Sequence, residues 1–291
     1  LHRVTQTLPA SFDLDEVLKA LPRATVMMAV PTFYHRMLGD ERMNANLCRS
    51  IRLFTSGSAP LSAQMHGDFE ARCGHRILER YGATETMILT SNPLHGERRP
   101  GAVGLPLPGV ELRVADEQDR GLPRGEIGMI QVRGAGLFSG YWKLPEKTAE
   151  EFTSDGFFRT GDLGWQSADD YVTITGRAKD MIISGGYNVY PIEIESVLDA
   201  HAAVAESAVI GIPHPDFGEA VTAVVTLRPG KAAGTQENEL IAWVKARLAN
   251  YKVPKHVVIV DQLPRNAMGK IQKNALRETY ARIADSETGR A

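Results

Sequence analysis

The sequence is poor in cysteine and carries no excess of charge of one sign, and each shortage argues against a class of protein. Two cysteines, Cys48 and Cys73, occur among 291 residues, and they form no C-x-x-C pair. This pattern suits a reducing compartment, so we expect a cytoplasmic protein. The 33 basic residues are balanced by 35 acidic ones. We therefore expect neither nucleic acid nor an anionic membrane as a partner.

Long apolar runs and metal-binding patterns are also missing. The longest apolar stretches, such as ATVMMAV at residues 24–30, fall far short of the roughly 20 residues that a membrane-spanning helix needs. They are typical of buried strands. The eight histidines are scattered, with no H-E-x-x-H pattern and no cysteine partners at ligand spacing, so we expect no zinc site. These features leave a globular protein as the expected class. The chain is 43% hydrophobic, and its length suggests about two domains.

The first part of the chain alternates helical and strand patterns. We expect a strand-like opening, helices at 14–21, 32–38 and 62–73, and strands at 24–30, 51–56 and 75–80. Ser62 is the expected N-cap of the third helix. This alternation predicts an open α/β sheet, whose ligands gather beyond the carboxyl ends of its strands. Two polar segments, SGSAP at 56–60 and YGATE at 81–85, follow two such strands.

The pattern changes twice further along. From Gly101, short alternating strands at 109–116, 125–134 and 171–176 predict a small antiparallel sheet or barrel. Beyond Gly176, helices at 190–200, 237–249 and 273–284 and strands at 204–212, 219–227 and 255–260 predict a compact α+β domain. We place the boundary in GRAKD, which gives domains at residues 1–177 and 178–291.

Five polar segments contain glycine or proline beside charged or hydroxyl residues, and each alone is more often an ordinary turn than a site. They are TSGSAP, YGATETM, FFRTGDLG, GRAKDMIISGGYNVYPIEIE and LPRNAMGKIQK. In this order they resemble the adenylate-forming superfamily of acyl-CoA synthetases, luciferases and peptide-synthetase adenylation domains. YGATE resembles the family's Y-G-x-T-E motif, RTGD its T-G-D motif, and PRNAMGKI its P-R-x-x-x-G-K motif. The resemblance implies the C-terminal part of the large adenylate-forming domain, followed by the family's small domain.

The resemblance implies a reaction of a carboxylate with ATP, which gives an acyl-adenylate and pyrophosphate, followed by attack of the coenzyme A thiol. It makes Lys270, Glu85 and Thr84 the catalytic residues. Lys270 would supply a cation near the α-phosphate, Thr84 would donate to the AMP phosphate, and Glu85 would hold Mg²⁺. The nucleotide-binding residues would be Gly57, Ser58, Ala59, Pro60, Tyr81, Gly82, Thr84, Asp162, Arg177 and Lys270.

The same resemblance implies that the small domain moves between two working states. Lys179 occupies the family's hinge position. In one state Lys270 completes the adenylation site. In the other state Ser184, Gly185 and Gly186 help to form the coenzyme A tunnel, where small residues let a thin chain pass close to the backbone.

Arg80 and Ala83 are the expected substrate-binding residues. ERYG followed by TE resembles the motif of malonyl-CoA synthetases, and a guanidinium can bind the second carboxylate of malonate bidentately. Ala83 stands where those enzymes usually carry methionine, so the pocket has room for methylmalonate. We therefore expect malonate, ATP and coenzyme A as substrates.

Three alternatives stay open from the sequence. In the first, the activated acid is methylmalonate, a fatty acid or an aryl acid instead of malonate. In the second, the chain is a peptide-synthetase adenylation domain. In the third, it is a non-catalytic fragment. The last alternative arises because the family's Ser/Thr/Gly-rich phosphate loop, with its lysine, has no match here, and we expect the chain alone to be incomplete.

Overall fold

The structure is a computed structural model that describes residues 12–231, 234–266, 269–281 and 283. Its chain forms two compact units. Unit 1 consists of Leu1–Glu111, Gly134–Lys143 and Asp169–Thr173, and unit 2 of Leu112–Arg133, Leu144–Ala168 and Ile174–Ala291. Within the described ranges, every helix is too short or too polar to cross a membrane. The expected strand-like opening before residue 12 lies outside the described residues.

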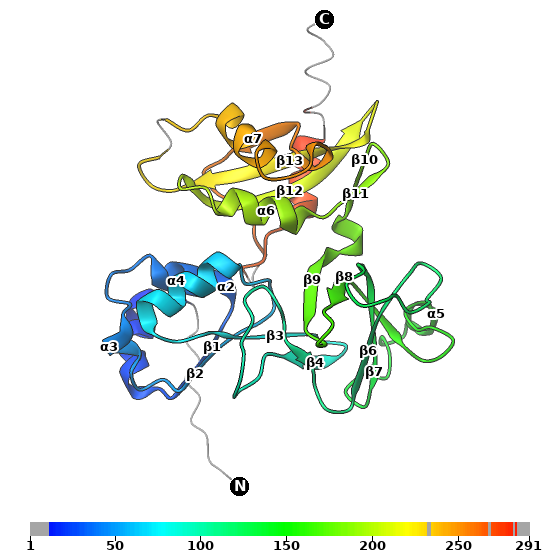
Figure 1. The fold of residues 1–291 in the computed structure, drawn as a ribbon, viewed down its shortest axis with the longest axis horizontal. Coiled ribbons are helices and arrows are strands. Elements are labelled where there is room, and N and C mark those ends of the chain that lie inside the picture. Colours follow the sequence, from blue (N-terminus) through cyan, green and yellow to red (C-terminus); the bar gives the residue numbers. More distant parts are fainter. Residues whose placement is uncertain (1–11, 232–233, 267–268, 282, 284–291) are drawn as a thin grey trace, which may run out of the picture. The chain divides into compact units, whose positions relative to one another are not determined.

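Unit 1 is built on a five-stranded sheet in the order β1-β2-β3-β4-β5 (Figure 1). Its strands are β1 (Val26–Ala29), β2 (Leu53–Ser56), β3 (Leu78–Ala83), β4 (Met87–Ser91) and β5 (Leu105–Pro106). The first three are parallel, as the alternating pattern predicted, whereas β4 and β5 extend the sheet in antiparallel fashion. The carboxyl end of β2 therefore lies beside the first part of β3, because Ser56 and Glu79 are partners in the register and β3 continues to Ala83.

Helices of unit 1 cover one face of this sheet. They are α1 (Leu14–Ala20), the 3₁₀ turn η1 (Leu21–Arg23), α2 (Pro31–Leu38), α3 (Ala45–Cys48) and α4 (Ala63–Cys73). Ser62 caps α4 as predicted, since its hydroxyl accepts the Met65 N–H at 3.1 Å. Tyr34 and Phe69 from α2 and α4 meet Phe54 of β2 in edge-to-face contacts. These contacts lock both helices to the strand that leads to SGSAP.

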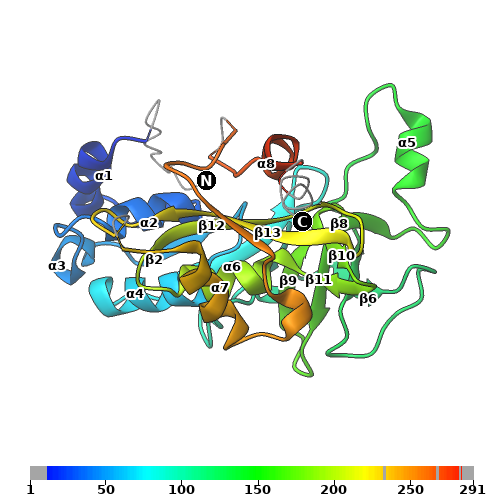
Figure 2. The same cartoon turned by 90° about the horizontal axis from the view of Figure 1, so that it is seen from above.

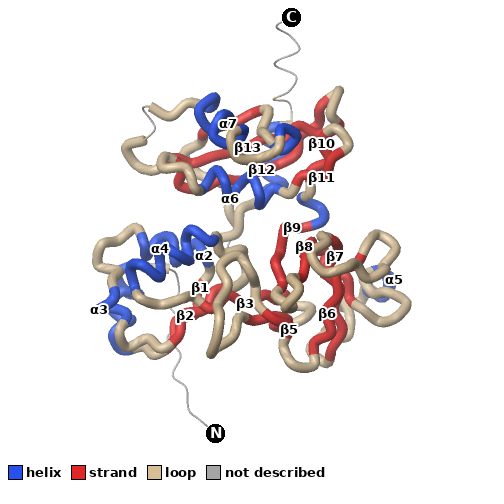
Figure 3. Tube along the Cα trace, in the orientation of Figure 1, coloured by secondary structure: helices blue, strands red, loops and turns tan. Residues whose placement is uncertain are grey.

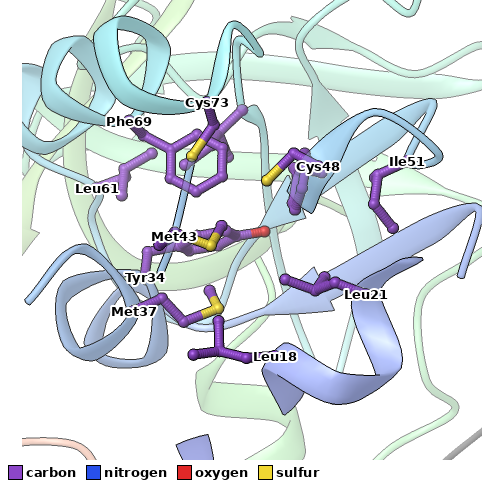
Figure 4. Packing of buried hydrophobic residues seen from close by; sticks show 12 residues of the cluster. Leu18, Leu21, Tyr34, Met37, Met43, Cys48, Ile51, Leu61, Phe69 and Cys73 are labelled. Atoms are coloured by element: carbon purple, nitrogen blue, oxygen red, sulfur yellow. The ribbon is translucent and has the colours of Figure 1, made fainter. Parts of the chain in front are cut away.

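The core of unit 1 also holds both cysteines. Cys48 and Cys73 are buried and free, and Figure 4 shows their sulfur atoms facing each other beside Phe69. They pack as small apolar side chains of the cluster.

A four-stranded sheet in the order β6-β7-β8-β9 follows in the chain, and most of it belongs to unit 2 (Figure 3). Its elements are β6 (Val110–Ala115), β7 (Gly128–Gly134), β8 (Phe158–Gln166), β9 (Val172–Arg177) and, between β7 and β8, helix α5 (Pro145–Glu150). The predicted strands of this region are confirmed. Strand β8 was not predicted, and it contains the whole of RTGD.

The rest of unit 2 is the expected α+β domain. Its strands are β10 (Ile182–Ser184), β11 (Tyr187–Val189), β12 (Val204–His214), β13 (Gly218–Leu227) and β14 (His256–Ile259). Its helices are α6 (Pro191–Asp199), α7 (Glu237–Lys245) and α8 (Lys273–Tyr280), with 3₁₀ turns η2 (Ala178–Asp180) and η3 (Asn250–Lys252). Helices α6 and α7 pack on one face of the β12–β13 pair, while α8 packs on the other (Figure 2).

Candidate active site

Two of the expected polar segments meet at the carboxyl edge of the parallel strands of unit 1. The turn Gly57–Pro60 leaves β2 beside β3, and a Cβ on Gly57 would lie 3.3 Å from the Arg80 carbonyl oxygen. Ser58 adopts φ 68°, a left-handed conformation that non-glycine residues seldom take. The turn is thus held against the strand that carries Arg80 and Tyr81.

The ERYGATETM segment is more regular than its composition suggested. We expected the strand to end at Arg80 and YGATE to follow it as a polar segment, but β3 continues to Ala83, and β4 begins at Met87. Gly82 permits the pairing, because a Cβ at this position would lie 1.9 Å from the Met87 carbonyl oxygen. The Thr86 hydroxyl accepts the Ala83 N–H at 3.0 Å and closes the turn. Thr84 and Glu85 are therefore presented at the tip of a hairpin.

A second segment of unit 1, residues 134–143, holds Glu85 in place. The Phe138 N–H donates to the Glu85 carbonyl oxygen at 2.8 Å, and the Tyr141 hydroxyl donates to Glu85 Oε1 at 3.2 Å. Sequence reasoning missed Tyr141, although the aromatic pair in GYW was a visible signal. The contact fixes one carboxylate oxygen at the hairpin tip.

Glu85 suits one particular kind of metal binding. No cluster of three or more acidic, histidine or cysteine side chains able to hold a metal is found in the described ranges. Mg²⁺ commonly binds through one or two carboxylates and takes its remaining ligands from phosphate oxygens and water. The single carboxylate of Glu85 fits a Mg²⁺ ion carried on a nucleotide phosphate better than a resident metal centre.

Arg80 points to the face of the sheet opposite the helices and has few polar partners. Its Nη2 donates to Thr55 Oγ1 at 3.1 Å and lies 3.9 Å from the sulfur of Met28, while its buried Nε has no hydrogen-bond acceptor in the described part of the chain. Across residues 12–231, 234–266, 269–281 and 283, no carboxylate forms an ion pair with Arg80. A partly buried guanidinium with this environment can receive an anionic ligand.

Tyr34 of α2 binds the backbone of Thr55, the residue whose hydroxyl Arg80 contacts. Its hydroxyl donates to the Thr55 carbonyl oxygen at 2.8 Å. Burial raises the pKa of Tyr34 well above its ordinary value, and the positive charge of Arg80 opposes this rise by a smaller amount. Tyr34 therefore stays a neutral donor that holds the strand carrying Thr55.

Glu79 lies on the helix-covered face, and sequence reasoning did not single it out. Only 3% of it is exposed. Its Oε1 accepts the Leu61 N–H at 3.1 Å, directly after the Gly57–Pro60 turn, and its Oε2 has no partner among the described residues. Burial raises the pKa of Glu79 to about 8, against a smaller lowering by the Leu61 hydrogen bond. A largely uncharged acid thus anchors the turn at neutral pH.

Asp162 and Arg177, both in unit 2, are brought together as the motif predicted. Asp162 lies within β8 and is 7% exposed. Its Oδ1 accepts from Arg177 Nη1 at 2.8 Å, and its backbone N–H donates to Thr160 Oγ1 at 3.1 Å. No strand was predicted at RTGD, yet β8 runs through it, with Gly161 at φ 73°. The pair presents a carboxylate and a guanidinium at one point of the sheet.

The glycine-rich segment forms a tight hairpin that was not predicted. Ser184 ends β10 and pairs with Tyr187 of β11, with Gly185 at φ 58° and Gly186 at φ 82° between them. Two consecutive residues with positive φ form the type of turn that glycine favours in hairpins. Ser184 is buried, whereas both glycines are exposed. Lys179 lies exposed in η2.

Lys270 lies in unit 2, and it is exposed. Its N–H donates to Asn266 Oδ1 at 3.0 Å, and its carbonyl oxygen accepts the Asn266 N–H at 2.9 Å. Residues 267–268 of the PRNAMGKI segment lie outside the described residues.

Comparison with known families now fixes the class of the protein. A model of AMP-binding enzymes matches residues 1–142, and a model of the C-terminal domain of AMP-binding enzymes matches residues 193–270. The chain belongs to the adenylate-forming superfamily of AMP-binding enzymes.

The chain is also similar to individual members of this superfamily. The chain is 41% identical to the malonate–CoA ligase of Arabidopsis thaliana, with 88% of this chain and 44% of the relative covered. It is 40% identical to the sulfoacetate–CoA ligase of Cupriavidus necator, with 94% and 53% covered. The crystal structure of ATP-bound MatB from Rhodopseudomonas palustris matches with TM-score 0.92 and 54% identity, over 95% of this chain and 55% of that one. The chain thus spans about half the length of the proteins that it matches.

Proposed function

We propose that this chain is the acid-recognising and domain-moving part of an ATP-dependent carboxylate–CoA ligase. The reaction converts malonate, ATP and coenzyme A into malonyl-CoA, AMP and diphosphate through an acyl-adenylate. ATP, coenzyme A and Mg²⁺ are the required small molecules. The similarity to ligases for malonate and sulfoacetate supports acids that carry a second anionic group.

One observation carries the choice of acid. Arg80 offers a partly buried guanidinium, with no carboxylate partner in the described ranges, on the strand that leads into the turn with Thr84 and Glu85. A dicarboxylate has one carboxylate to be activated and one to be recognised. A planar guanidinium recognises the second one through two parallel hydrogen bonds, so an acid that lacks it leaves the cation unpaired. Ala83, exposed beside Gly82, leaves room for methylmalonate.

The nucleotide roles follow the hairpin geometry of unit 1. Thr84 donates to the α-phosphate, and Glu85, oriented by Tyr141, holds Mg²⁺ on the phosphates. Tyr81 and the Gly57–Pro60 turn contact the adenine. Mg²⁺ supplies positive charge that offsets repulsion between the substrate carboxylate and the phosphates.

Unit 2 supplies the remaining roles. Asp162 binds the ribose hydroxyls with two acceptor oxygens, and Arg177 lies beside it. Lys270 supplies the cation of the adenylation step. We further propose that residues 178–291 move as one domain about Lys179, and that the Ser184–Gly186 hairpin serves coenzyme A in the second step.

A second candidate is a ligase for another acid, such as a fatty or aryl acid. The test uses the full-length gene product and measures AMP-forming thioester synthesis with malonate, methylmalonate, sulfoacetate, butyrate and benzoate. The proposal expects malonate to exceed butyrate in kcat/KM by about 10² or more, as when a buried charge loses its partner. Equal turnover of butyrate and malonate would refute the choice of acid. Failure to release AMP with every acid would refute the ligase itself.

A further inference from the structure

Lys270 is exposed, yet its backbone is closely held. Residues 264–266 and 269–272 pair with each other, and we call these two stretches the hairpin: Arg265 and Ile271 form an antiparallel bridge, and the Gln272 N–H donates to the Pro264 carbonyl oxygen at 2.8 Å. The Gly269 N–H also donates to the Asn266 carbonyl oxygen at 2.9 Å. A long, exposed lysine at such a place needs a fixed base if its ammonium group is to meet a substrate repeatedly at one point.

Arg265 connects this hairpin to the sheet. Its Nη1 donates to the carbonyl oxygen of Gly269, the residue before Lys270, at 2.6 Å. Its Nη2 forms an ion pair with Glu206 of β12. One guanidinium therefore links β12, an edge strand of the sheet, to the backbone next to Lys270.

The link requires an arginine. A guanidinium has several donors in a rigid fork, so it can bind a carbonyl oxygen and a carboxylate at once. Glu206 is itself tied to the sheet through its pairing with Thr226. The Arg265 and Glu206 side chains are about a quarter and a third exposed. An ion pair so open to water contributes little to global stability, which points to a local role.

We propose that Arg265, anchored by Glu206, is a positioning residue for Lys270 in the adenylation step. This inference rests on the proposed function, because it assigns Lys270 to the first half-reaction. Loss of the link lets residues 269–272 move relative to β12, and the ammonium group of Lys270 then reaches the reacting atoms less often. The thioester step, in which Lys270 takes no part, is unaffected.

The experiment compares Arg265→Met, Arg265→Lys and Glu206→Gln with a control, Arg247→Met, in the full-length gene product. Arg247, just beyond the end of α7, also donates to a backbone carbonyl, that of Trp243 at 3.0 Å, but it is not part of the hairpin. Hydrogen–deuterium exchange follows the hydrogen-bonded amides of Asn266, Gly269, Lys270 and Gln272. Two kinetic assays follow adenylation and thioester formation from supplied malonyl-adenylate.

In Arg265→Met, exchange in the hairpin should rise about fivefold or more, while the β12–β13 amides keep their protection. Adenylation kcat/KM should fall about tenfold or more, and transfer from supplied malonyl-adenylate should stay within about twofold. Arg265→Lys should resemble Arg265→Met, because one ammonium cannot hold both acceptors. Arg247→Met should change none of these readouts.

Unchanged hairpin exchange in Arg265→Met overturns the inference without touching the proposed function. Faster hairpin exchange in Arg265→Met with unchanged adenylation also overturns the inference. If Lys270→Ala then keeps full adenylation as well, the proposed role of Lys270 in adenylation is wrong. An equal loss in both half-reactions overturns it too, because that result indicates general damage to the domain.

Discussion

Replacing Glu79 with glutamine should change how the stability of the protein depends on pH. The folded protein holds the pKa of this buried carboxyl at about 8, whereas its ordinary value is 4.5. The proton is therefore bound more tightly in the folded state. The stabilisation that comes from this bound proton is complete below pH 4.5 and is lost as the pH rises through about 8.

The magnitude follows from the width of that window. Each pH unit changes the free energy of unfolding by about 1.4 kcal/mol, so the window from 4.5 to about 8 corresponds to a loss of up to about 5 kcal/mol. Glutamine has nearly the shape of the protonated acid. Its carbonyl oxygen can accept the Leu61 N–H, but it does not titrate.

The assay is urea unfolding of wild type and Glu79→Gln at pH 5, 6, 7, 8 and 9, followed by circular dichroism. Glu79→Gln should be close to wild type at pH 5 and should become more stable than wild type, by several kcal/mol, at pH 9. A difference between the two proteins that stays constant from pH 5 to 9 would refute the buried neutral carboxyl. Direct observation of the Glu79 carboxyl by ¹³C NMR should give a midpoint near pH 8.

Three further outcomes are expected. Tyr141→Phe removes the hydrogen bond to Glu85 and should raise the Mg²⁺ concentration needed for half-maximal adenylation about three- to tenfold, and an unchanged Mg²⁺ dependence would contradict this. Lys270→Ala should reduce adenylation by about 10² or more and spare transfer from supplied malonyl-adenylate; equal losses in both assays would speak against it. Burial raises the pKa of Asp199 to about 7, so wild type should lose stability as the pH rises from 4 to 7. Asp199→Asn should lose less stability over this range, and a pH dependence of the free energy of unfolding equal to that of wild type would refute this.

Much of the fold could be predicted because periodic apolar patterns decide helices and strands locally. Helix α6 and strands β12 and β13 bury one face or both faces against their neighbours, and their apolar spacing is visible in the sequence. Ser62 was recognised as a cap because its hydroxyl acts on residues close in the chain. Such features need no knowledge of distant residues.

Other features depend on contacts between distant residues and were missed. Strand β8 was not predicted because its glycines mask the alternation, and it is held by its pairing with β7. Tyr141 reaches Glu85 from 56 residues away. Glu79 was not singled out, and it is buried where its carboxylate accepts the Leu61 N–H from 18 residues away. Burial and partnership of this kind arise only when separate elements pack together.

The family motifs located the candidate residues but not their surroundings. Asp162 was expected from T-G-D, and the structure adds its pairing with Arg177. Lys270 was expected from P-R-x-x-x-G-K, and the structure adds the link through Arg265 to Glu206. A motif records which residue types recur at a spacing, whereas orientation depends on side chains that lie outside the motif.

The central claim is that Arg80 selects an acid with a second anionic group. The most direct measurement is the ratio of kcat/KM for malonate to that for butyrate in wild type, Arg80→Met and the control Arg76→Met, whose arginine pairs with Glu70 on the surface. The account predicts a ratio of about 10² or more for wild type and Arg76→Met, and a ratio near one for Arg80→Met. A wild type that uses butyrate as well as malonate, or an Arg80→Met variant that still selects malonate, would contradict it.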